Sequence, residues 1–222
     1  MSHERYPPTT AIADVLALRG LPGVLDRCRL SPVGAPMPAP IAGRARTVRL
    51  EPGAGGFGPL YSLLSSTLRG QVVVIEAAGV EGAVWGEILT AAARQAGAVA
   101  AVVDGRVRDH AAMAASGLPV WGGEPWPTGP AGTACVAAID EPLRVAGADV
   151  RPGDLVVLDG DGVVALRDPA LMEGARGVLA KAARYAAAEQ QVLDALAAGD
   201  PLEVAYQHKA AVVRQIAGGE PT

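Results

Sequence analysis

A run of six small apolar residues, Ala98 to Val103, most constrains the fold of this 222-residue chain. A helical pattern lies on each side of the run, over residues 86–96 and 109–116. A short, continuous apolar run is typical of a parallel strand that is covered on both faces. We therefore expect a mixed α/β structure in which strands alternate with helices along the middle of the chain.

The remaining segments supply the other layers of such a fold. Helices are expected at residues 9–19, 60–68, 169–198 and from about 202 to 216, the first with a threonine as N-cap. Strands are expected at 41–50, 71–76, 135–139, 155–158 and 163–166. Loops are expected at 31–40, 52–59 and 120–130. Asp159-Gly-Asp-Gly162 separates two of these strands and indicates a hairpin rather than a calcium loop. We expect one domain over residues 1–198 and a helical tail over 199–222.

Composition excludes several classes of partner. Half of the residues are hydrophobic, and 19 basic against 23 acidic residues give a net charge of −4. An acidic chain without a basic stripe is poorly suited to nucleic acid or to anionic lipid. No apolar stretch approaches the ~20 residues that span a bilayer, and residues 1–8 lack the apolar region of a secretory signal. We expect a cytoplasmic protein that contacts neither nucleic acid nor membrane.

Cys28 and Cys135 are far apart in the sequence and lie among apolar residues. Free cysteines in such surroundings are commonly buried, so we expect two buried thiols. Two distant cysteines do not predict a disulfide framework or a zinc site.

Two acids and an arginine lie at the ends of the central helix–strand unit. Twenty residues separate Gly86-Glu87 from Arg108-Asp109. Carboxylate oxygens can hold a hard divalent cation, and an arginine can stabilise an oxyanion. Charged residues just after a parallel strand also occupy the edge where α/β sheets bind ligands. In the alternative interpretation, Asp109 caps the second helix and forms a local ion pair.

The start of the first of these helices offers unpaired backbone donors. The amides of Gly86, Glu87, Ile88 and Leu89 belong to its N-terminus, where a carboxylate can bind. Gly86 would let a ligand approach the backbone closely. An ordinary helix start, with Glu87 favourably placed against the helix dipole, is the alternative.

The spacing Gly86-Glu87-x20-Arg108-Asp109 resembles the RraA-like family, which includes 4-hydroxy-4-methyl-2-oxoglutarate aldolases and oxaloacetate decarboxylases. Further likeness lies in Leu118-Pro119-Val120 and in residues 10–16 and 150–164. The resemblance extends from about residue 9 to residue 190. It implies a class II pyruvate aldolase on a β/β/α swivelling-domain-like mixed sheet, with flanking helices and a long C-terminal helix.

The resemblance also implies roles for the residues of the motif. Asp109 would anchor Mg²⁺ or Mn²⁺, largely through ordered waters, and Glu87 would share the hydration shell of the metal. The amides of residues 86–89 would hold the substrate carboxylate. Arg108 would face the 2-oxo oxygen and stabilise the pyruvate enolate.

Family members assemble as homotrimers or homohexamers with active sites between subunits. The resemblance matches Glu189 to a glutamate that reaches the metal waters of a neighbouring subunit from the C-terminal helix. In the alternative interpretation, Glu189 lies on a solvated helix face.

Three features leave alternatives open. His110 either touches the site or caps its helix. The loop over residues 122–131, with Trp121 just before it and Trp126 within it, could reshape the pocket. Gly53-Ala-Gly-Gly-Phe-Gly58 fits the dinucleotide-binding pattern G-x-G-x-x-G, but the strand before it carries three arginines, whereas a central strand of that fold is apolar.

We therefore expect a metal-dependent lyase that cleaves a 2-oxo dicarboxylic acid, either by retro-aldol cleavage or by oxaloacetate decarboxylation, and releases pyruvate. A non-catalytic regulator that binds a ribonuclease is the first alternative. An enzyme on the same scaffold that acts on a different oxo-acid is the second.

Overall fold

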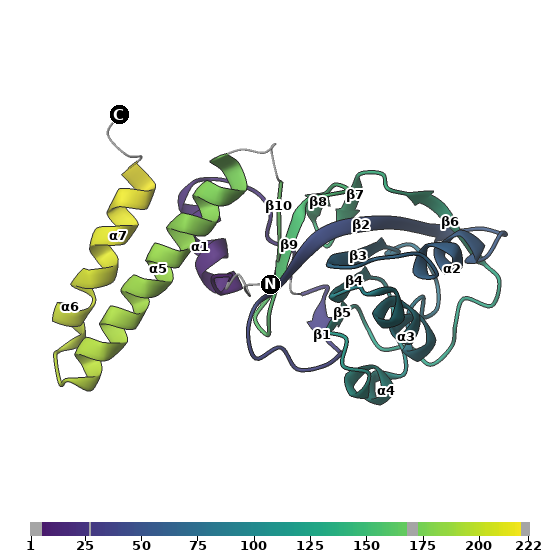
Figure 1. The fold of residues 1–222 in the computed structure, drawn as a ribbon, viewed down its shortest axis with the longest axis horizontal. Coiled ribbons are helices and arrows are strands. Elements are labelled where there is room, and N and C mark those ends of the chain that lie inside the picture. The colour runs from purple at the N-terminus through teal and green to yellow at the C-terminus, as the bar shows by residue number, and fades with distance from the viewer. Residues whose placement is uncertain (1–5, 27, 168–172, 219–222) are drawn as a thin grey trace.

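A mixed eight-stranded sheet forms the centre of the computed structural model, which describes residues 6–26, 28–167 and 173–218 (Figure 1). The strand order is β1-β5-β4-β3-β2-β9-β10, and β6 pairs with β2. The strands are β1 (Ser31–Pro32), β2 (Ile41–Pro52), β3 (Gln71–Glu76), β4 (Ala100–Asp104), β5 (Val120–Gly122), β6 (Ala134–Ile139), β9 (Leu155–Leu158) and β10 (Val163–Leu166), with β7 (Leu143–Val145) and β8 (Ala148–Val150) as a separate hairpin. The helices are α1 (Thr9–Leu18), α2 (Gly58–Leu64), α3 (Glu87–Ala96), α4 (His110–Ala115), α5 (Glu173–Ala197), α6 (Leu202–Ala205) and α7 (Gln207–Gly218).

The strands β2, β3, β4 and β5 run parallel, and α2, α3 and α4 connect them in turn. Both faces of this parallel part are covered, as the apolar run predicted. Val73 and Ile75 pack on the side of α2, α3 and α4, whereas Val72 and Val74 pack against the β7–β8 hairpin. This alternation explains why β3 and β4 are apolar at successive positions.

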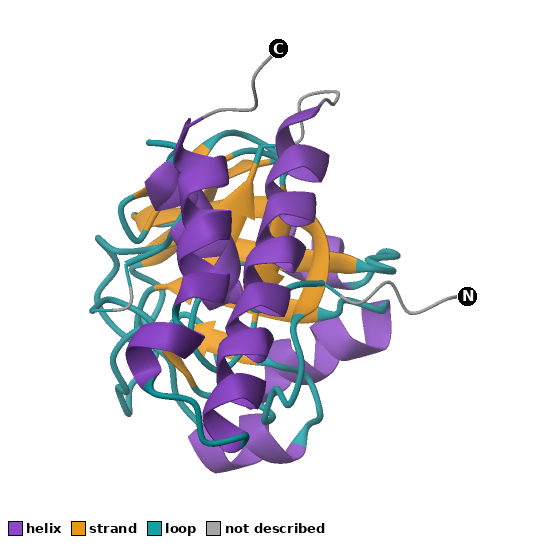
Figure 2. Ribbon diagram, turned by 90° about the vertical axis from the view of Figure 1, so that its left-hand side faces the viewer, coloured by secondary structure: helices purple, strands orange, loops and turns teal. Residues whose placement is uncertain are grey.

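A second group of helices covers β9 and β10 (Figure 2). Ile12 of α1, Tyr185 of α5 and Ile216 of α7 are buried together against these strands. The Tyr185 hydroxyl donates a 2.6 Å hydrogen bond to Asp14 Oδ2 and so joins α5 to α1. Helix α7, within the predicted tail, runs back along α5. No helix among the described residues combines the length and the apolar character that crossing a membrane requires.

The N-terminus of α1 differs from the prediction of a threonine N-cap. Pro8 occupies the N-cap position and makes no capping hydrogen bond of its own. Thr9 is the first helical residue, and its amide and hydroxyl donate to the Asp159 carboxylate at 2.8 and 2.5 Å. Because the Asp161 and Gly162 amides donate to the same carboxylate, Asp159 holds the β9–β10 turn and α1 together. The predicted hairpin is therefore confirmed.

The predicted mixed α/β architecture, with flanking helices and a long C-terminal helix, is confirmed. Residues 169–172 of the predicted C-terminal helix lie outside the described residues. The predicted loops at 31–40 and 120–130 are wrong in part, because β1 and β5 pair with each other there. The β7–β8 hairpin was not predicted. The prediction of two buried thiols is also wrong, since Cys28 is exposed and Cys135 is partly exposed.

Candidate active site

Two short extended segments bring the predicted site residues together. Val84 donates its amide hydrogen to the Arg106 carbonyl at 2.9 Å, and Arg108 donates to the Trp85 carbonyl at 3.0 Å. These bonds continue the parallel pairing of β3 with β4 beyond the ends of both strands, with Trp85 opposite Val107. As a result, Gly86-Glu87 and Arg108-Asp109 lie side by side at the carboxyl edge of the sheet.

Asp109 has a backbone conformation that is rare for a residue with a side chain. Its φ of 62° and ψ of 39° lie in the left-handed region, at the N-cap position of α4. The carboxylate does not cap α4. Instead, Asp109 Oδ2 accepts a 3.3 Å hydrogen bond from the Glu87 amide and lies 3.7 Å from Arg108 Nε. Strained backbone of this kind persists where the surrounding structure imposes it, often at functional sites.

Gly86 is required by this close approach. A Cβ atom at residue 86 would lie 2.7 Å from Asp109 Oδ2 and 3.0 Å from Arg108 Cγ. Real Cβ atoms do not tolerate the shorter of these separations, so any other residue would displace the carboxylate. The close approach at Gly86 is thus made by protein groups, and the predicted approach of a ligand to the Gly86 backbone stays a prediction.

The start of α3 is held rigidly. The first intrahelical bond runs from the Thr90 amide to the Gly86 carbonyl at 3.0 Å, so the amides of residues 87–89 precede it. The Thr90 hydroxyl also donates to the Gly86 carbonyl, and it accepts a 2.8 Å hydrogen bond from Nε1 of the fully buried Trp85. These bonds fix the direction of the amides at the start of α3, and amides at a helix N-terminus can bind an anion.

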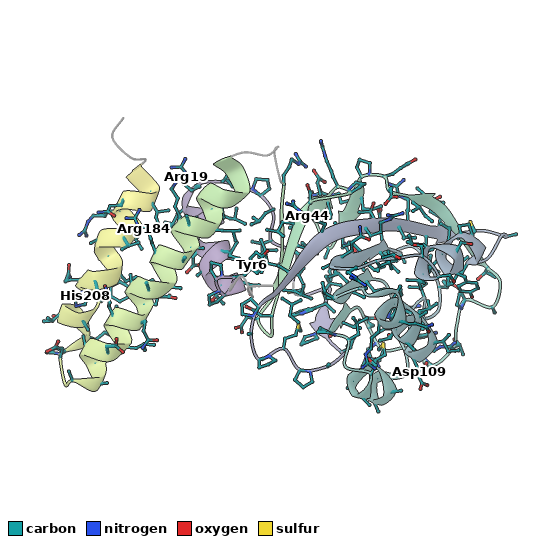
Figure 3. The ribbon with its side chains drawn as sticks, in the orientation of Figure 1. Tyr6, Arg19, Arg44, Asp109, Arg184 and His208 are labelled. Atoms are coloured by element: carbon teal, nitrogen blue, oxygen red, sulfur yellow. The ribbon has the colours of Figure 1, made fainter. Side chains whose placement is uncertain are left out.

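The site residues at 86–89 and 108–109 line a cavity of about 660 Å³, a size typical of small-molecule sites. Glu87, Arg108 and Asp109 are its charged lining residues among those that the structure describes. Asp109 lies beside α4, in the half of the molecule that holds the parallel strands (Figures 1 and 3). The remaining lining residues carry no charge: Gly56, Phe57, Tyr61, Leu64, Ser65, Ala83, Val84, Trp85, Gly86, Ile88, Leu89, Ala92, Gly129, Pro130, Ala131, Gly132 and Ala134.

A family model described as Aldolase/RraA matches residues 9–165, which include the whole cavity. The chain belongs to the RraA-like family. A Halalkalibacterium halodurans protein with the provisional name 4-hydroxy-4-methyl-2-oxoglutarate aldolase is 31% identical over 170 residues, which make up 73% of each chain. Among solved structures, an uncharacterized protein from Pseudomonas syringae pv. tomato shares the fold, with a TM-score of 0.75, 24% identity and coverage of 90% of this chain and 92% of that one.

The RNA-processing inhibitor RraA from Thermus thermophilis is also similar to this chain, with a TM-score of 0.56 and 25% identity. That comparison covers 69% of the present chain and 90% of the Thermus protein. The RraA-like family therefore contains proteins named as aldolases and proteins named as inhibitors of RNA processing.

The donor set of this RraA-like chain fits a hard divalent cation better than zinc. The candidate ligands in the cavity, Asp109 and Glu87, offer oxygen atoms only, and both side chains are exposed to it. No group of three or more His, Cys, Asp or Glu side chains close enough to hold a metal occurs among the described residues. Mg²⁺ and Mn²⁺ suit such a site because Mg²⁺ commonly binds one or two carboxylates and retains several waters.

Glu189 lies far from this cavity within its own chain. It is on α5, and its Oε1 atom accepts a 2.6 Å ion-paired hydrogen bond from Lys209 Nζ of α7. Burial alone would lower the pKa of Lys209, but hydrogen bonds to Glu189 and Tyr185 raise it above its usual value. Glu189 also lies outside the residues matched by the family model. Its predicted role at a neighbouring subunit's metal stays a prediction.

The loop over residues 122–131 contributes Gly129, Pro130 and Ala131 to the cavity, rather than tryptophan. Trp126 stacks over the Arg106 guanidinium, 4.3 Å from ring centroid to Cζ. The buried Trp121, which precedes this loop in β5, donates from Nε1 to the Asp159 carbonyl at 3.0 Å. Neither ring is among the described residues that line the cavity, whereas a Cβ at Gly129 would lie 3.7 Å from Arg108 Nη1.

His110 is the first residue of α4 and is half-buried. It is not among the described lining residues, and the N-cap position belongs to Asp109. Neither interpretation offered for His110 is therefore confirmed.

The glycine-rich segment 53–58 lies between β2 and α2, as a dinucleotide-binding loop would. However, Gly56 and Phe57 line the cavity already described, so the segment forms part of the wall of that site. This contribution to the cavity wall was not predicted. A glycine-rich turn after a strand was the only available signal.

Proposed function

We propose that this chain is a divalent-metal-dependent carbon–carbon lyase that acts on 2-oxo acids and releases pyruvate. The observation that carries the proposal is the position of the Asp109 carboxylate, turned away from its own helix and onto the Glu87 amide beside Arg108. The provisional name of the Halalkalibacterium relative supports it, as does the oxygen-only donor set of the cavity.

The Ile88 and Leu89 amides at the start of α3 would bind the carboxylate of the 2-oxo acid, because the Glu87 amide already donates to Asp109. They offer N–H donors and the positive end of the helix dipole. Because Trp85 and Thr90 fix this helix end, the carboxylate would be held in one orientation. Binding of this kind reduces the entropic cost of reaching the transition state.

Arg108 would then face the 2-oxo oxygen. Its guanidinium group lies against Gly129, and its Nε atom lies near Asp109. A fixed cation at this place stabilises the negative charge that develops on the oxygen as the enolate forms. Asp109 and Glu87 would hold Mg²⁺ or Mn²⁺, which, when bound, polarises the 2-oxo group as a Lewis acid.

In retro-aldol cleavage, the C4 hydroxyl loses its proton and the C3–C4 bond breaks. The bonding electron pair moves into the C2–C3 bond and onto the C2 oxygen, giving a carbonyl product and pyruvate enolate. Protonation of the enolate at C3 yields pyruvate. Oxaloacetate would lose carbon dioxide and form the same enolate, without deprotonation of a hydroxyl group.

Pyruvate release from 4-hydroxy-4-methyl-2-oxoglutarate, followed with lactate dehydrogenase and NADH, tests the proposal. The assay is repeated with oxaloacetate in place of the first compound. An enzyme-free blank at the same metal concentration is needed, because metals promote the decarboxylation of oxaloacetate in solution. We expect pyruvate release that requires Mg²⁺ or Mn²⁺ and stops with EDTA. Release at the blank rate from both compounds would contradict the proposal.

A second candidate function follows from the similarity to the Thermus RNA-processing inhibitor. In this alternative, the chain would bind a ribonuclease and need no metal or oxo-acid. An RNA-cleavage assay with ribonuclease E distinguishes the two functions. Inhibition by both the wild-type chain and Asp109→Asn, together with no pyruvate release, would favour the regulator.

We further propose that the chain acts as a homotrimer or homohexamer in the cytoplasm, with Glu189 reaching the metal waters of a neighbouring subunit. Within one chain, α5 lies at the opposite end of the molecule from Asp109 (Figures 1 and 3). Light scattering coupled to size-exclusion chromatography measures the assembly. A monomer that retains full activity would overturn this proposal.

A further inference from the structure

Two glycines confine the Arg108 side chain. A Cβ atom at Gly86 would lie 3.0 Å from Arg108 Cγ, and a Cβ atom at Gly129 would lie 3.7 Å from Arg108 Nη1. The contact between Arg108 Nε and Asp109 Oδ2 is long for a charged hydrogen bond, at 3.7 Å. The position of the guanidinium group therefore depends on where the chain places the backbone of these two glycines.

The loop that carries Gly129 is joined to the edge of the sheet beside the site. Val107 donates its amide hydrogen to the Glu124 carbonyl at 3.1 Å, and its own carbonyl accepts a 2.9 Å hydrogen bond from the Trp126 amide. Residues 124–126 therefore lie alongside Val107 in the same parallel sense as the strands before them. This pairing anchors the loop three residues before Gly129.

A side-chain hydrogen bond fixes the path from this anchor to Gly129. Trp126 Nε1 donates to Thr128 Oγ1 at 2.9 Å, and the bond spans Pro127. The Thr128 carbonyl also accepts a 2.8 Å hydrogen bond from the Ala83 amide. Because the proline ring fixes φ at residue 127, the conformation of Thr128 sets the direction in which the chain enters Gly129.

The Trp126 ring is itself held in place. It lies over the Arg106 guanidinium, 4.3 Å from ring centroid to Cζ, and Arg106 Nε lies 3.9 Å from Glu124 Oε2. A guanidinium group over an aromatic face is attracted to it, so the ring has a preferred orientation. Trp126 is exposed and is not a described cavity residue, so its hydrogen bond to Thr128 is what connects it with the site.

We infer that Trp126 and Thr128 are positioning residues for Arg108. Their hydrogen bond holds Gly129 against the guanidinium group and so keeps the cation where it can face the 2-oxo oxygen. The inference rests on the proposed lyase function and gives the loop over residues 122–131 a role in it. All of these contacts lie within one chain, so the inference does not depend on what a neighbouring subunit adds to the cavity.

Thr128→Val tests the inference because it removes the hydroxyl group and keeps the shape of the side chain. Deuterium uptake into the methyl group of pyruvate in D₂O, with metal present, measures enolate formation. We expect the maximal rate of uptake to fall about tenfold, since small displacements of a catalytic group have effects of that order or larger. The pyruvate concentration for half-maximal uptake should not change, because the α3 amides bind the carboxylate.

Two further variants and a control make the test specific to the hydrogen bond. Thr128→Ser keeps a hydroxyl group and should retain the wild-type rate. Trp126→Phe keeps a ring beside Arg106 but has no N–H group, so it should reproduce the loss seen in Thr128→Val. Thr67→Val makes the same change at an exposed threonine that is not a described cavity residue, and it should leave the rate unchanged.

Combination with Arg108→Lys separates positioning of Arg108 from a general effect on the fold. Arg108→Lys keeps the charge but removes the planar group that lies against Gly129. Adding Thr128→Val to that variant should therefore cause no further loss of uptake. An equal loss in the wild-type and Arg108→Lys backgrounds would show that Thr128 acts independently of Arg108 and would overturn the inference.

The remaining outcomes distinguish this inference from the lyase function. A wild-type rate in Thr128→Val or in Trp126→Phe, or a reduced rate in Thr128→Ser, would overturn the inference and leave the lyase function in place. Absence of metal-dependent uptake in the wild type would instead remove the lyase function itself.

Discussion

The Glu87 amide donates a 3.3 Å hydrogen bond to the carboxylate of Asp109, which lies 22 residues later in the sequence, and so joins the starts of α3 and α4. The bond turns Asp109 away from the helix that it precedes and toward the cavity. Its partner Glu87 offers a second carboxylate to the same space. This relationship is the structural basis for assigning a metal and an oxo-acid to the site.

Replacing Asp109 with asparagine should weaken the metal site without unfolding the chain. Asparagine tolerates the left-handed backbone but removes the charge. We expect Mn²⁺ binding to weaken by about 10- to 100-fold, with a comparable loss of activity at limiting metal. Calorimetric titration with Mn²⁺ measures the binding directly.

Asp140→Asn is the matched control for that variant. Asp140 is also an exposed aspartate in the left-handed region, with a φ of 58°, and it is not a described cavity residue. Its replacement should leave Mn²⁺ affinity unchanged. Equal Mn²⁺ affinity in the wild type and in Asp109→Asn would exclude Asp109 as the anchor of the metal.

Gly86→Ala tests whether the close packing at the helix start matters for catalysis. The added methyl group would meet Asp109 Oδ2 and Arg108 Cγ, so both functional groups must move. We expect kcat to fall by roughly 100-fold, since small misplacements of catalytic groups have effects of that order. Gly58→Ala adds a methyl group where nothing lies within 4 Å. A normal kcat for Gly86→Ala would show that the observed geometry is not required.

The central part of the site was predictable because its signals are local. The apolar run before Asp104 and the helical pattern after Gly86 predict one strand and one helix, and their order brings residues 86–87 close to 108–109. What the pattern could not predict is that Asp109 leaves α4 uncapped. The orientation of the Asp109 carboxylate depends on its contact with the Glu87 amide and on the space beside Gly86, and both arise only when the chain folds.

The β7–β8 hairpin and β5 were not predicted from the sequence because they depend on tertiary contacts. Each strand of the β7–β8 hairpin has only three residues. Its two-residue turn is Ala146-Gly147, with φ values of 44° and 82°, so it has a turn glycine but lacks the Asn or Asp that usually precedes it. The buried Asp104 carboxylate accepts a 2.6 Å hydrogen bond from the Ala146 amide and so holds this turn. Likewise, β5 is a strand because it pairs with both β4 and β1.

Stability should fall at alkaline pH because of the contacts between α5 and α7. Burial, followed by the hydrogen bond to Asp14, raises the pKa of Tyr185, and the pKa of Lys209 is raised by Glu189 and Tyr185 despite burial. The unfolded chain releases these protons near the ordinary values of 10.0 and 10.5, before the folded chain does. Their contribution is therefore complete below pH 10 and declines as the pH rises further.

Urea unfolding at pH 8, 10 and 11 measures this effect. For each group that keeps its proton only in the folded state, the free energy of unfolding should fall by up to about 1.4 kcal/mol per pH unit. Lys209→Met removes one of these groups and should give a shallower slope above pH 10. An identical slope in the variant would show that Lys209 does not contribute.

Glu189→Gln and Lys209→Met together test the proposed contribution of Glu189 to a neighbouring site. Both variants lose the same 2.6 Å ion pair, but only the first loses the carboxylate. If Glu189 holds metal waters across a subunit interface, Glu189→Gln should lower kcat by about tenfold or more, while Lys209→Met keeps it. Equal kcat values for the two variants would limit Glu189 to a structural role.

Deuterium uptake into the methyl group of pyruvate, followed by proton NMR in D₂O, shows whether Arg108, Asp109 and Glu87 promote formation of the pyruvate enolate. This measurement is direct because enolate formation does not depend on the distal part of the substrate. We expect rapid uptake with Mg²⁺ or Mn²⁺, none above the blank with EDTA, and a loss on the order of 100-fold in Arg108→Met. Uptake at the blank rate with metal present, or undiminished uptake in Arg108→Met, would contradict the proposed lyase function.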